Sequence, residues 1–177
     1  MTTVLIVPGL GGSGPEHWQT RWENIDARCV RVQQGDWNAP VCSTWIASLE
    51  QAVRDAAGDV VLVAHSLGVV LVAHWARSGS VHKVKGAFLV APPDVESPLR
   101  APAEIRHFAP IPRDRLPFPS IVVASQDDPY ACIDCPRQLA DAWGARFVDL
   151  GTAGHINADS GLGSWQAGRD LLAQLLA

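Results

Sequence analysis

Six runs of apolar residues recur along the chain, and most of them are continuous rather than alternating. They lie at residues 3–7, 29–32, 60–64, 86–90, 120–124 and 146–150. Continuous apolar runs of this length are typical of strands that are buried on both faces of a parallel sheet. Helical patterns lie between them. The sequence therefore predicts a three-layer α/β/α fold with a mostly parallel six-stranded sheet and right-handed crossovers.

Apolar stripes at helical spacing mark the segments between the strands. One stripe runs through residues 45–56 and follows Ser43, which we expect to cap the helix. Another runs through residues 71–76 and ends at Gly79. A final helix is expected over residues 164–176.

The chain of 177 residues has the size of one domain, residues 1–177, without a separate substrate domain. Residues 92–119 are rich in proline and follow the fourth predicted strand, at the sheet edge where ligands bind in open α/β sheets. We expect this segment to be an irregular loop that shapes a pocket, with one short helix at residues 103–108.

The charge balance is mildly acidic, with 14 Lys and Arg residues against 18 Asp and Glu residues, and no basic run is present. Nucleic acid and anionic membranes are therefore not expected as partners. No targeting pattern and no apolar stretch of about 20 residues is visible, so we expect a cytoplasmic protein. Cys132 and Cys135 form one C-x-x-C motif without a second pair, so no metal is expected. Ordinary thiols or a redox pair remain open readings.

Ser66 lies between an apolar strand and an apolar helix, within the segment Ala64-His65-Ser66-Leu67-Gly68. A nucleophilic serine needs such a strand-turn-helix context, with small residues two positions on either side, because the two backbones pass closely there. Gly68 meets this requirement, and Ala64 adds one methyl group to the usual glycine. The alternative reading is a serine that only caps a helix.

Acidic residues and a histidine follow the fifth and sixth predicted strands, at the same carboxyl edge as Ser66. A histidine at position 155 can accept the serine proton, and a buried carboxylate can orient its imidazole. The chain order Ser, Asp, His is the order of α/β-hydrolases. Both Asp127 and Asp128 fit the position of the acid, and we prefer Asp128, although the residues alone barely separate the two. Asp149 is a third candidate, but it lies at the end of a strand and close to His155 in sequence.

The other histidines are poorer candidates for the base. His65 is adjacent to Ser66 and is expected to point away from it across the turn. His74 lies eight residues along the helix, about 12 Å from Ser66 at about 1.5 Å per residue. His82 and His107 are expected to be solvated in loops.

These motifs resemble the small α/β-hydrolase family that includes retinoblastoma-binding protein 9 and the bacterial YdeN proteins, over nearly the whole length. The resemblance rests on Val7-Pro8-Gly9, His17-Trp18, the Trp37, Pro40 and Trp45 segment, the segment around Ser66, Asp127-Asp128-Pro129 and Gly154-His155. It implies an α/β-hydrolase fold without a large cap domain and a serine hydrolase activity of esterase or peptidase-like type. It also implies Asp128 as the acid, and the backbone N–H groups of Leu10 and Leu67 as the oxyanion hole. The predicted acyl transfer to water requires no cofactor.

A second reading comes from Gly9, Gly11 and Gly14, which fit G-x-G-x-x-G after a strand, with Asp36 about twenty residues further on. This pattern indicates a Rossmann-like dinucleotide site. A third reading is a binding protein without catalysis on a hydrolase fold.

The aromatic residues supply candidate pocket walls. Trp75, Trp143 and Trp165 lie in helical segments and are expected in the core. His17, Trp18 and Trp37 come from the first two connections and are candidates for substrate contact. The leading hypothesis is hydrolysis of a small ester or amide by Ser66, His155 and Asp128 through an acyl-enzyme.

Overall fold

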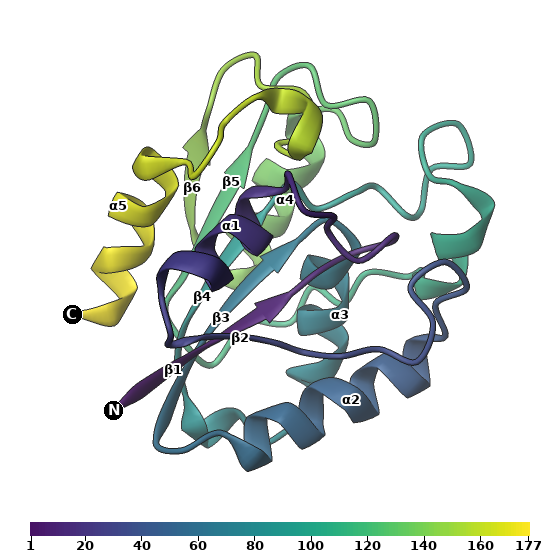
Figure 1. Ribbon diagram of the computed structural model, residues 1–177. Coiled ribbons are helices and arrows are strands. Elements are labelled where there is room, and N and C mark those ends of the chain that lie inside the picture. The colour runs from purple at the N-terminus through teal and green to yellow at the C-terminus, as the bar shows by residue number, and fades with distance from the viewer.

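A parallel sheet of six strands runs through the centre of the protein in the computed structural model, which describes residues 1–177 (Figure 1). The strands are β1 (Thr2–Val7), β2 (Cys29–Arg31), β3 (Asp59–His65), β4 (Val84–Val90), β5 (Ser120–Ala124) and β6 (Arg146–Asp149). Their order is β2-β1-β3-β4-β5-β6, and every neighbouring pair is parallel. The predicted sheet is confirmed, and it is parallel throughout.

Helices cover both faces of the sheet. They are α1 (Trp18–Ile25), α2 (Cys42–Asp55), α3 (Leu67–Trp75), α4 (Asp134–Trp143) and α5 (Gln166–Leu176). Leu49, Trp75 and Leu139 of α2, α3 and α4 join the core on one face. Trp22 of α1 and Leu172 of α5 join the core on the other, and Figure 1 shows α2 and α5 on opposite sides of the sheet. The three predicted layers are confirmed. None of these helices combines the length and apolar character needed to cross a lipid bilayer.

Burial on both faces explains why the strand sequences are continuously apolar. In β3, Val60 and Leu62 belong to the core beneath α2 and α3, whereas Val61 and Val63 belong to the core beneath α1 and α5. All four are fully buried. Because each such side chain contributes about 1.5–3 kcal/mol when buried, a polar residue at any of these positions would weaken the fold.

The helix starts differ from two predictions. Helix α2 begins at Cys42 with Val41 as its N-cap, so the predicted Ser43 cap is wrong. The carbonyl of Val41 accepts from the N–H of Trp45, whose side chain is buried, so the first turn forms two residues earlier than predicted. Helix α5 begins at Gln166 rather than at residue 164, because Trp165 has a φ of 43° and lies outside the helical region. The short helix at Ala103–Phe108 forms as expected, with 3-10 geometry.

The strand order reverses between β1 and β3. Strand β2 lies on one side of β1 and β3 on the other, so the loops after β1 and β3 lead to helices on opposite faces of the sheet. In open α/β sheets this switch point forms a crevice at the carboxyl ends of the strands. The turns after β5 and β6 open at the same edge because all strands are parallel.

Candidate active site

Ser66 lies on a sharp turn between β3 and α3. Its backbone has φ 56° and ψ −125°, a conformation that residues other than glycine rarely adopt. Ser66 occupies the N-cap position of α3, but its hydroxyl makes no capping hydrogen bond. Instead, its Oγ lies 2.8 Å from Nε2 of His155. The hydroxyl of Ser66 is therefore directed to the imidazole rather than to the helix.

His155 connects this serine to a carboxylate. Its Nδ1 lies 2.8 Å from Oδ2 and 3.0 Å from Oδ1 of Asp128. The side chains of His155 and Asp128 are both buried. A carboxylate accepts hydrogen bonds, so Nδ1 carries the proton in neutral His155 and Nε2 is free to accept from Ser66. The structure thus brings together the three residues that the sequence nominated, in a Ser-His-Asp arrangement.

Asp127 and Asp149 lie apart from this arrangement. Asp127 is exposed, and its Oδ1 accepts from Oγ of Ser125 at 2.6 Å and from the N–H of Gly154 at 2.8 Å. The Ser125 hydrogen bond is the larger cause of a lowered Asp127 pKa, followed by the bond from Gly154. Asp149 is exposed at the end of β6 and accepts from the side chain of Gln126. Neither carboxylate contacts His155.

The loop after β1 packs closely against the turn at Ser66. A Cβ atom at Gly9 would lie 2.9 Å from the backbone nitrogen of Leu67, and one at Gly68 would lie 2.2 Å from the carbonyl oxygen of Val7. Leu67 is the first residue of α3, where backbone N–H groups lack an acceptor within the helix. Leu10 follows Gly9 and lines the pocket beside Ser66.

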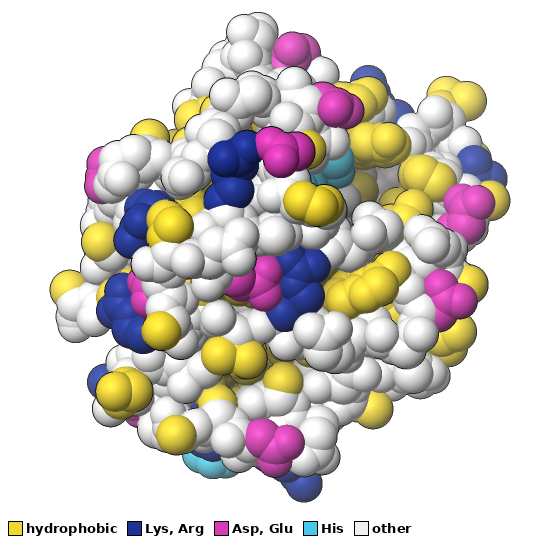
Figure 2. Space-filling view, viewed as in Figure 1, with side chains coloured by type: hydrophobic (Ala, Val, Ile, Leu, Met, Phe, Trp, Pro, Cys, Tyr) yellow, Lys and Arg dark blue, Asp and Glu magenta, His cyan; other side chains and the backbone are white.

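A pocket of about 260 Å³ opens directly above Ser66 and His155. Figure 2 shows a hollow in the surface where a histidine side chain is visible among hydrophobic side chains. One wall comes from the loop after β1 and is largely polar or backbone. The opposite wall includes Pro93, Pro102 and Ile105 from the predicted proline-rich segment. The other lining residues are Leu10, Gly11, Ser13, Gly14, His17, His65, Tyr130, Asn157 and Ala158.

His17 lies in the pocket wall and caps α1. Its Nδ1 accepts from the N–H of Gln19 at 3.1 Å, so neutral His17 carries its proton on Nε2, which is buried and has no hydrogen-bond partner. Burial, together with the nearby His155 and Arg31, lowers the pKa of His17 to about 4. Protonation of His17 is therefore disfavoured at neutral pH.

Trp18 and Trp37 do not line the pocket. Trp18 is fully buried, and its Nε1 donates to the carbonyl oxygen of Ile156 at 2.8 Å, just after His155. The Trp37 ring packs against Trp45 and against Gly12, where a Cβ atom would lie 2.8 Å from the indole. Of the three residues suggested for substrate contact, only His17 reaches the pocket in this structure.

His65 was expected to point away from Ser66; its side chain makes no hydrogen bond to Ser66, but it lines the same pocket. Side chains alternate along β3, and His65 therefore faces the same side of the sheet as Val61 and Val63. There its ring lies 4.9 Å from the His155 ring and lines the pocket. His74 does lie apart, with its Nε2 bonded to the carbonyl oxygen of Phe108 at 2.7 Å.

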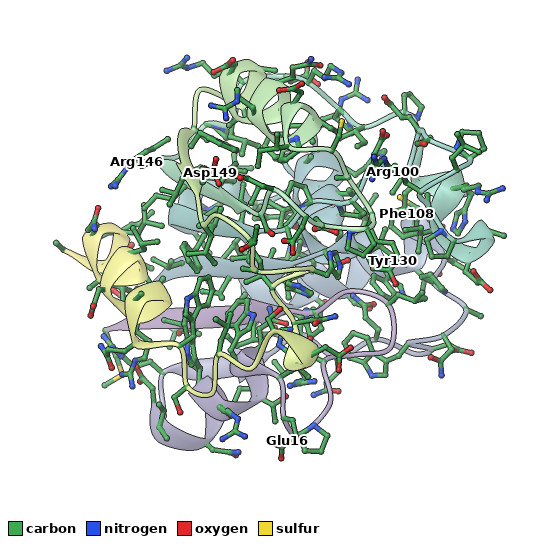
Figure 3. The ribbon with its side chains drawn as sticks, turned by 90° about the horizontal axis from the view of Figure 1, so that it is seen from above. Glu16, Arg100, Phe108, Tyr130, Arg146 and Asp149 are labelled. Carbon is green, nitrogen blue, oxygen red and sulfur yellow. The ribbon has the colours of Figure 1, made fainter.

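Tyr130 is a pocket residue that the sequence reasoning missed. Its ring lies 4.5 Å from that of His155, and its N–H donates to Oδ1 of Asp128 at 2.8 Å. Figure 3 shows Tyr130 on the same side of the molecule as Phe108 and Arg100. The sequence did offer a signal for Tyr130: it lies two residues after Asp128, on the same turn at the carboxyl edge of the sheet.

The glycines of the possible dinucleotide motif lie in the pocket wall or beside the turn at Ser66. Gly11 and Gly14 line the pocket, and Gly9 packs against the turn at Ser66. Helix α1 starts only at Trp18, so its N-terminus does not directly follow the motif. Asp36 is exposed and accepts from the backbone N–H groups of Asn38 and Ala39. Close packing at the serine turn accounts for Gly9 without a nucleotide.

The cysteines take no part in the arrangement of Ser66, His155 and Asp128. Cys132 is exposed in the turn before α4, Cys135 is half-buried in the first turn of α4, and both are free thiols. Burial raises the pKa of Cys135 to about 12. No group of three His, Cys, Asp or Glu side chains is placed to hold a metal ion.

Comparison with known proteins decides the family. The profile of the family described as "Serine hydrolase" matches residues 4–174, nearly the whole chain. The chain belongs to the serine hydrolase family. It is thus an enzyme, and the Ser-His-Asp arrangement lies in a serine hydrolase domain. A search of curated protein sequences gave no match.

Several solved structures share its fold. A YdeN-like hydrolase from Pectobacterium atrosepticum is 32% identical, with a TM-score of 0.87 over 99% of this chain and 90% of that one. The ydeN gene product of B. subtilis is 18% identical, with a TM-score of 0.79 over 99% of both chains. Est1E from Butyrivibrio proteoclasticus, with ferulic acid bound, is 13% identical and has a TM-score of 0.73 over 100% of this chain and 90% of that one. The first of these supports the predicted likeness to YdeN proteins, and the other two support the fold.

Proposed function

We propose that this serine hydrolase cleaves small carboxylic esters through an acyl-enzyme, with Ser66 as nucleophile, His155 as general base and acid, and Asp128 as the group that orients His155. The single observation that carries the proposal is the continuous hydrogen-bonded chain of these three side chains. The distance from Oγ of Ser66 to Nε2 of His155 is 2.8 Å, and that from Nδ1 of His155 to Oδ2 of Asp128 is also 2.8 Å.

Acylation begins when Nε2 of His155 accepts the hydroxyl proton and Oγ of Ser66 attacks the ester carbonyl. The resulting imidazolium is stabilised by the carboxylate of Asp128, which stays ionised throughout. His155 then donates its proton to the leaving alkoxide, and the acyl group remains on Ser66. In the second half, His155 takes a proton from water, the hydroxide attacks the acyl-enzyme, and the proton returns to Ser66 as the acid product leaves.

Charge on the carbonyl oxygen needs stabilisation in both tetrahedral intermediates. The backbone N–H groups of Leu67 and Leu10 are the proposed donors, since Leu67 follows the nucleophile and Leu10 borders the same pocket. The close packing of Gly9 against Leu67 supports this pairing because it keeps the two loops in contact. Removing one such donor typically lowers kcat by about 10²–10³-fold.

The pocket supports small substrates. Its volume of about 260 Å³ lies just below the usual range for drug-sized ligands, about 300–1,000 Å³. Pro93, Pro102 and Ile105 offer an apolar surface for a short acyl or alcohol chain. We therefore expect short-chain esters to react faster than long-chain esters, and a small molecule rather than a nucleic acid to be the substrate.

The proposal is tested by steady-state hydrolysis of p-nitrophenyl acetate, butyrate and octanoate by the native protein, Ser66→Ala and His155→Gln. His107→Gln is the control, because His107 is exposed on the short helix at Ala103–Phe108. We expect activity on the two short esters, with kcat lower by about 10³-fold or more in both site variants and unchanged in the control. Folded site variants with native activity would overturn the proposal.

A further inference from the structure

His65 links the nucleophile turn to the loop that carries the base. It is the last residue of β3 and directly precedes Ser66. Its side chain is buried, with 4% of the residue exposed, and its Nε2 lies 2.9 Å from the backbone carbonyl oxygen of His155. The hydrogen bond therefore joins the residue next to the proposed nucleophile to the backbone of the proposed base.

The direction of this hydrogen bond follows from chemistry. A carbonyl oxygen can only accept, so Nε2 of His65 carries the proton and donates it. Burial, followed by the neighbouring His17 and His155, holds the pKa of His65 well below its usual value. The ring is thus neutral at neutral pH, with a bare Nδ1.

Hydrogen bonds such as this one stabilise the loop from Ala153 to Ile156, which has an unfavourable backbone conformation. Gly154 and Ile156 have φ values of 58° and 50°, and for Ile156 this is an unfavourable conformation. Backbone groups on both sides of His155 make hydrogen bonds to side chains. The N–H of Ala153 donates to Oγ of Ser125, and the carbonyl oxygen of Ile156 accepts from Nε1 of Trp18. At His155 itself, the backbone carbonyl oxygen is bonded by His65.

We propose that His65 is a positioning residue that holds the backbone of His155 so that its Nε2 stays within hydrogen-bond reach of Ser66. This inference rests on the proposed function. The contact joins the two segments that carry the reacting groups, since His65 is adjacent to Ser66 in the chain and the acceptor is the backbone of His155. A displacement of about 1 Å between reacting groups can lower turnover by about 10²-fold.

Two substitutions separate the hydrogen bond from side-chain volume. In His65→Gln, the amide nitrogen can take the place of Nε2 and donate to the same carbonyl, whereas His65→Leu fills similar space without a donor. We expect kcat to fall by about 10–100-fold in His65→Leu with KM changed by less than about threefold, and His65→Gln to retain most of kcat.

His74 provides a matched control. Its Nε2 also bonds a backbone carbonyl, that of Phe108 at 2.7 Å, but this contact lies away from Ser66 and His155. His74→Leu should leave kcat unchanged, measured at a temperature where circular dichroism shows each variant to be folded. Native kcat in folded His65→Leu, or an equal loss in folded His65→Leu and His65→Gln, would overturn the positioning role.

Nitrogen NMR of the native protein with ¹⁵N-labelled histidine tests the same contact without a substitution. We expect His65, assigned by its loss in His65→Gln, to show a protonated Nε2 and a bare Nδ1 at pH 7. The opposite tautomer would contradict the proposal even if His65→Leu does not fold. Ser66→Ala separates the two claims: an active Ser66→Ala overturns the proposed function, whereas an inactive Ser66→Ala beside a fully active His65→Leu overturns only the role of His65.

Discussion

Asp127 and Asp128 are consecutive in the chain, but their carboxylates contact different parts of the loop after β6. Asp128 is buried and bonds Nδ1 of His155, whereas Asp127 is exposed and accepts from the backbone N–H of Gly154. Substitutions can therefore distinguish the roles of these two adjacent aspartates.

Asp128→Asn should lower kcat by about 10³–10⁴-fold, because an amide can donate to Nδ1 and thereby favour the wrong tautomer of His155. Asp127→Asn preserves the size of a side chain that accepts from Ser125 and Gly154 but does not contact His155, and an asparagine oxygen can still accept, so its kcat should fall by less than about tenfold. Ester hydrolysis by both variants measures the difference. A severe loss in Asp127→Asn with a mild one in Asp128→Asn would make Asp127 the acid.

Gly68 should tolerate no side chain. A Cβ atom there would lie 2.2 Å from the carbonyl oxygen of Val7 and 2.9 Å from that of Pro8, both backbone atoms. Gly68→Ala should therefore lower the free energy of unfolding by about 1–3 kcal/mol or more and reduce activity. Gly35→Ala is the control, since a Cβ atom at Gly35 meets nothing within 4 Å and should change stability by less than about 0.5 kcal/mol. Equal stability in urea denaturation would contradict the packing described for β1 and α3.

Stability should fall in acid because of His17. Its pKa is about 4 in the folded protein, against an ordinary value of 6.5, so the unfolded chain binds more protons between these values. The free energy of unfolding should therefore decrease as the pH falls from 7 to 4, with His17 contributing about 3 kcal/mol of that decrease.

His17→Asn isolates this contribution, since an asparagine oxygen can still accept from the N–H of Gln19 at the start of α1. Urea denaturation at pH 7 and pH 4 should show a smaller pH dependence in this variant. Some pH dependence should remain, because His65 also has a lowered pKa. An unchanged dependence would show that His17 does not titrate as described.

Arg31 should stabilise the loop after β1. Its guanidinium contacts the carboxylate of Glu23 and the carbonyl oxygens of Gly12 and Ser13, next to the pocket. Arg31→Met would leave the partly buried Glu23 carboxylate and the Gly12 carbonyl without their donor, whereas the Ser13 carbonyl would keep the hydroxyl of Thr20. We expect a loss of about 1–3 kcal/mol in the free energy of unfolding and a lower kcat.

Arg28→Met is the matched control for Arg31→Met. Arg28 is more exposed and bonds only Asp26, outside the pocket. A pair of this kind contributes about 0–1 kcal/mol, so thermal unfolding and kcat should be nearly native. Similar effects of the two substitutions would argue against a specific role of Arg31 in that loop.

The sheet was predictable because burial on both faces gives each strand a continuous apolar sequence, as in Val60–Val63 of β3. Helix starts were less predictable. Ser43 has the residue type of a cap, but the packing of Trp45 begins α2 at Cys42. Trp165 has a left-handed backbone conformation and a side chain buried in the core, and no local sequence pattern indicates that conformation.

The proposed triad could be nominated because each of its members follows a strand, and parallel strands share one carboxyl edge. The pocket walls depend on side-chain directions in irregular loops. Trp18 was a plausible pocket residue, but its indole turns inward to bond Ile156. His65 was expected to point away, whereas the alternation along β3 directs it toward His155. Continuing that alternation by one residue would have indicated the face that His65 occupies.

Labelling with a fluorophosphonate tests the central claim most directly. The probe would be applied to the native protein, Ser66→Ala and His155→Gln, and the modified residue mapped by mass spectrometry. We predict covalent modification of Ser66 alone, absent from Ser66→Ala and strongly slowed in His155→Gln, because only a serine activated by its base attacks the phosphorus rapidly. Modification of another residue, or none in the folded native protein, would contradict Ser66 as the nucleophile.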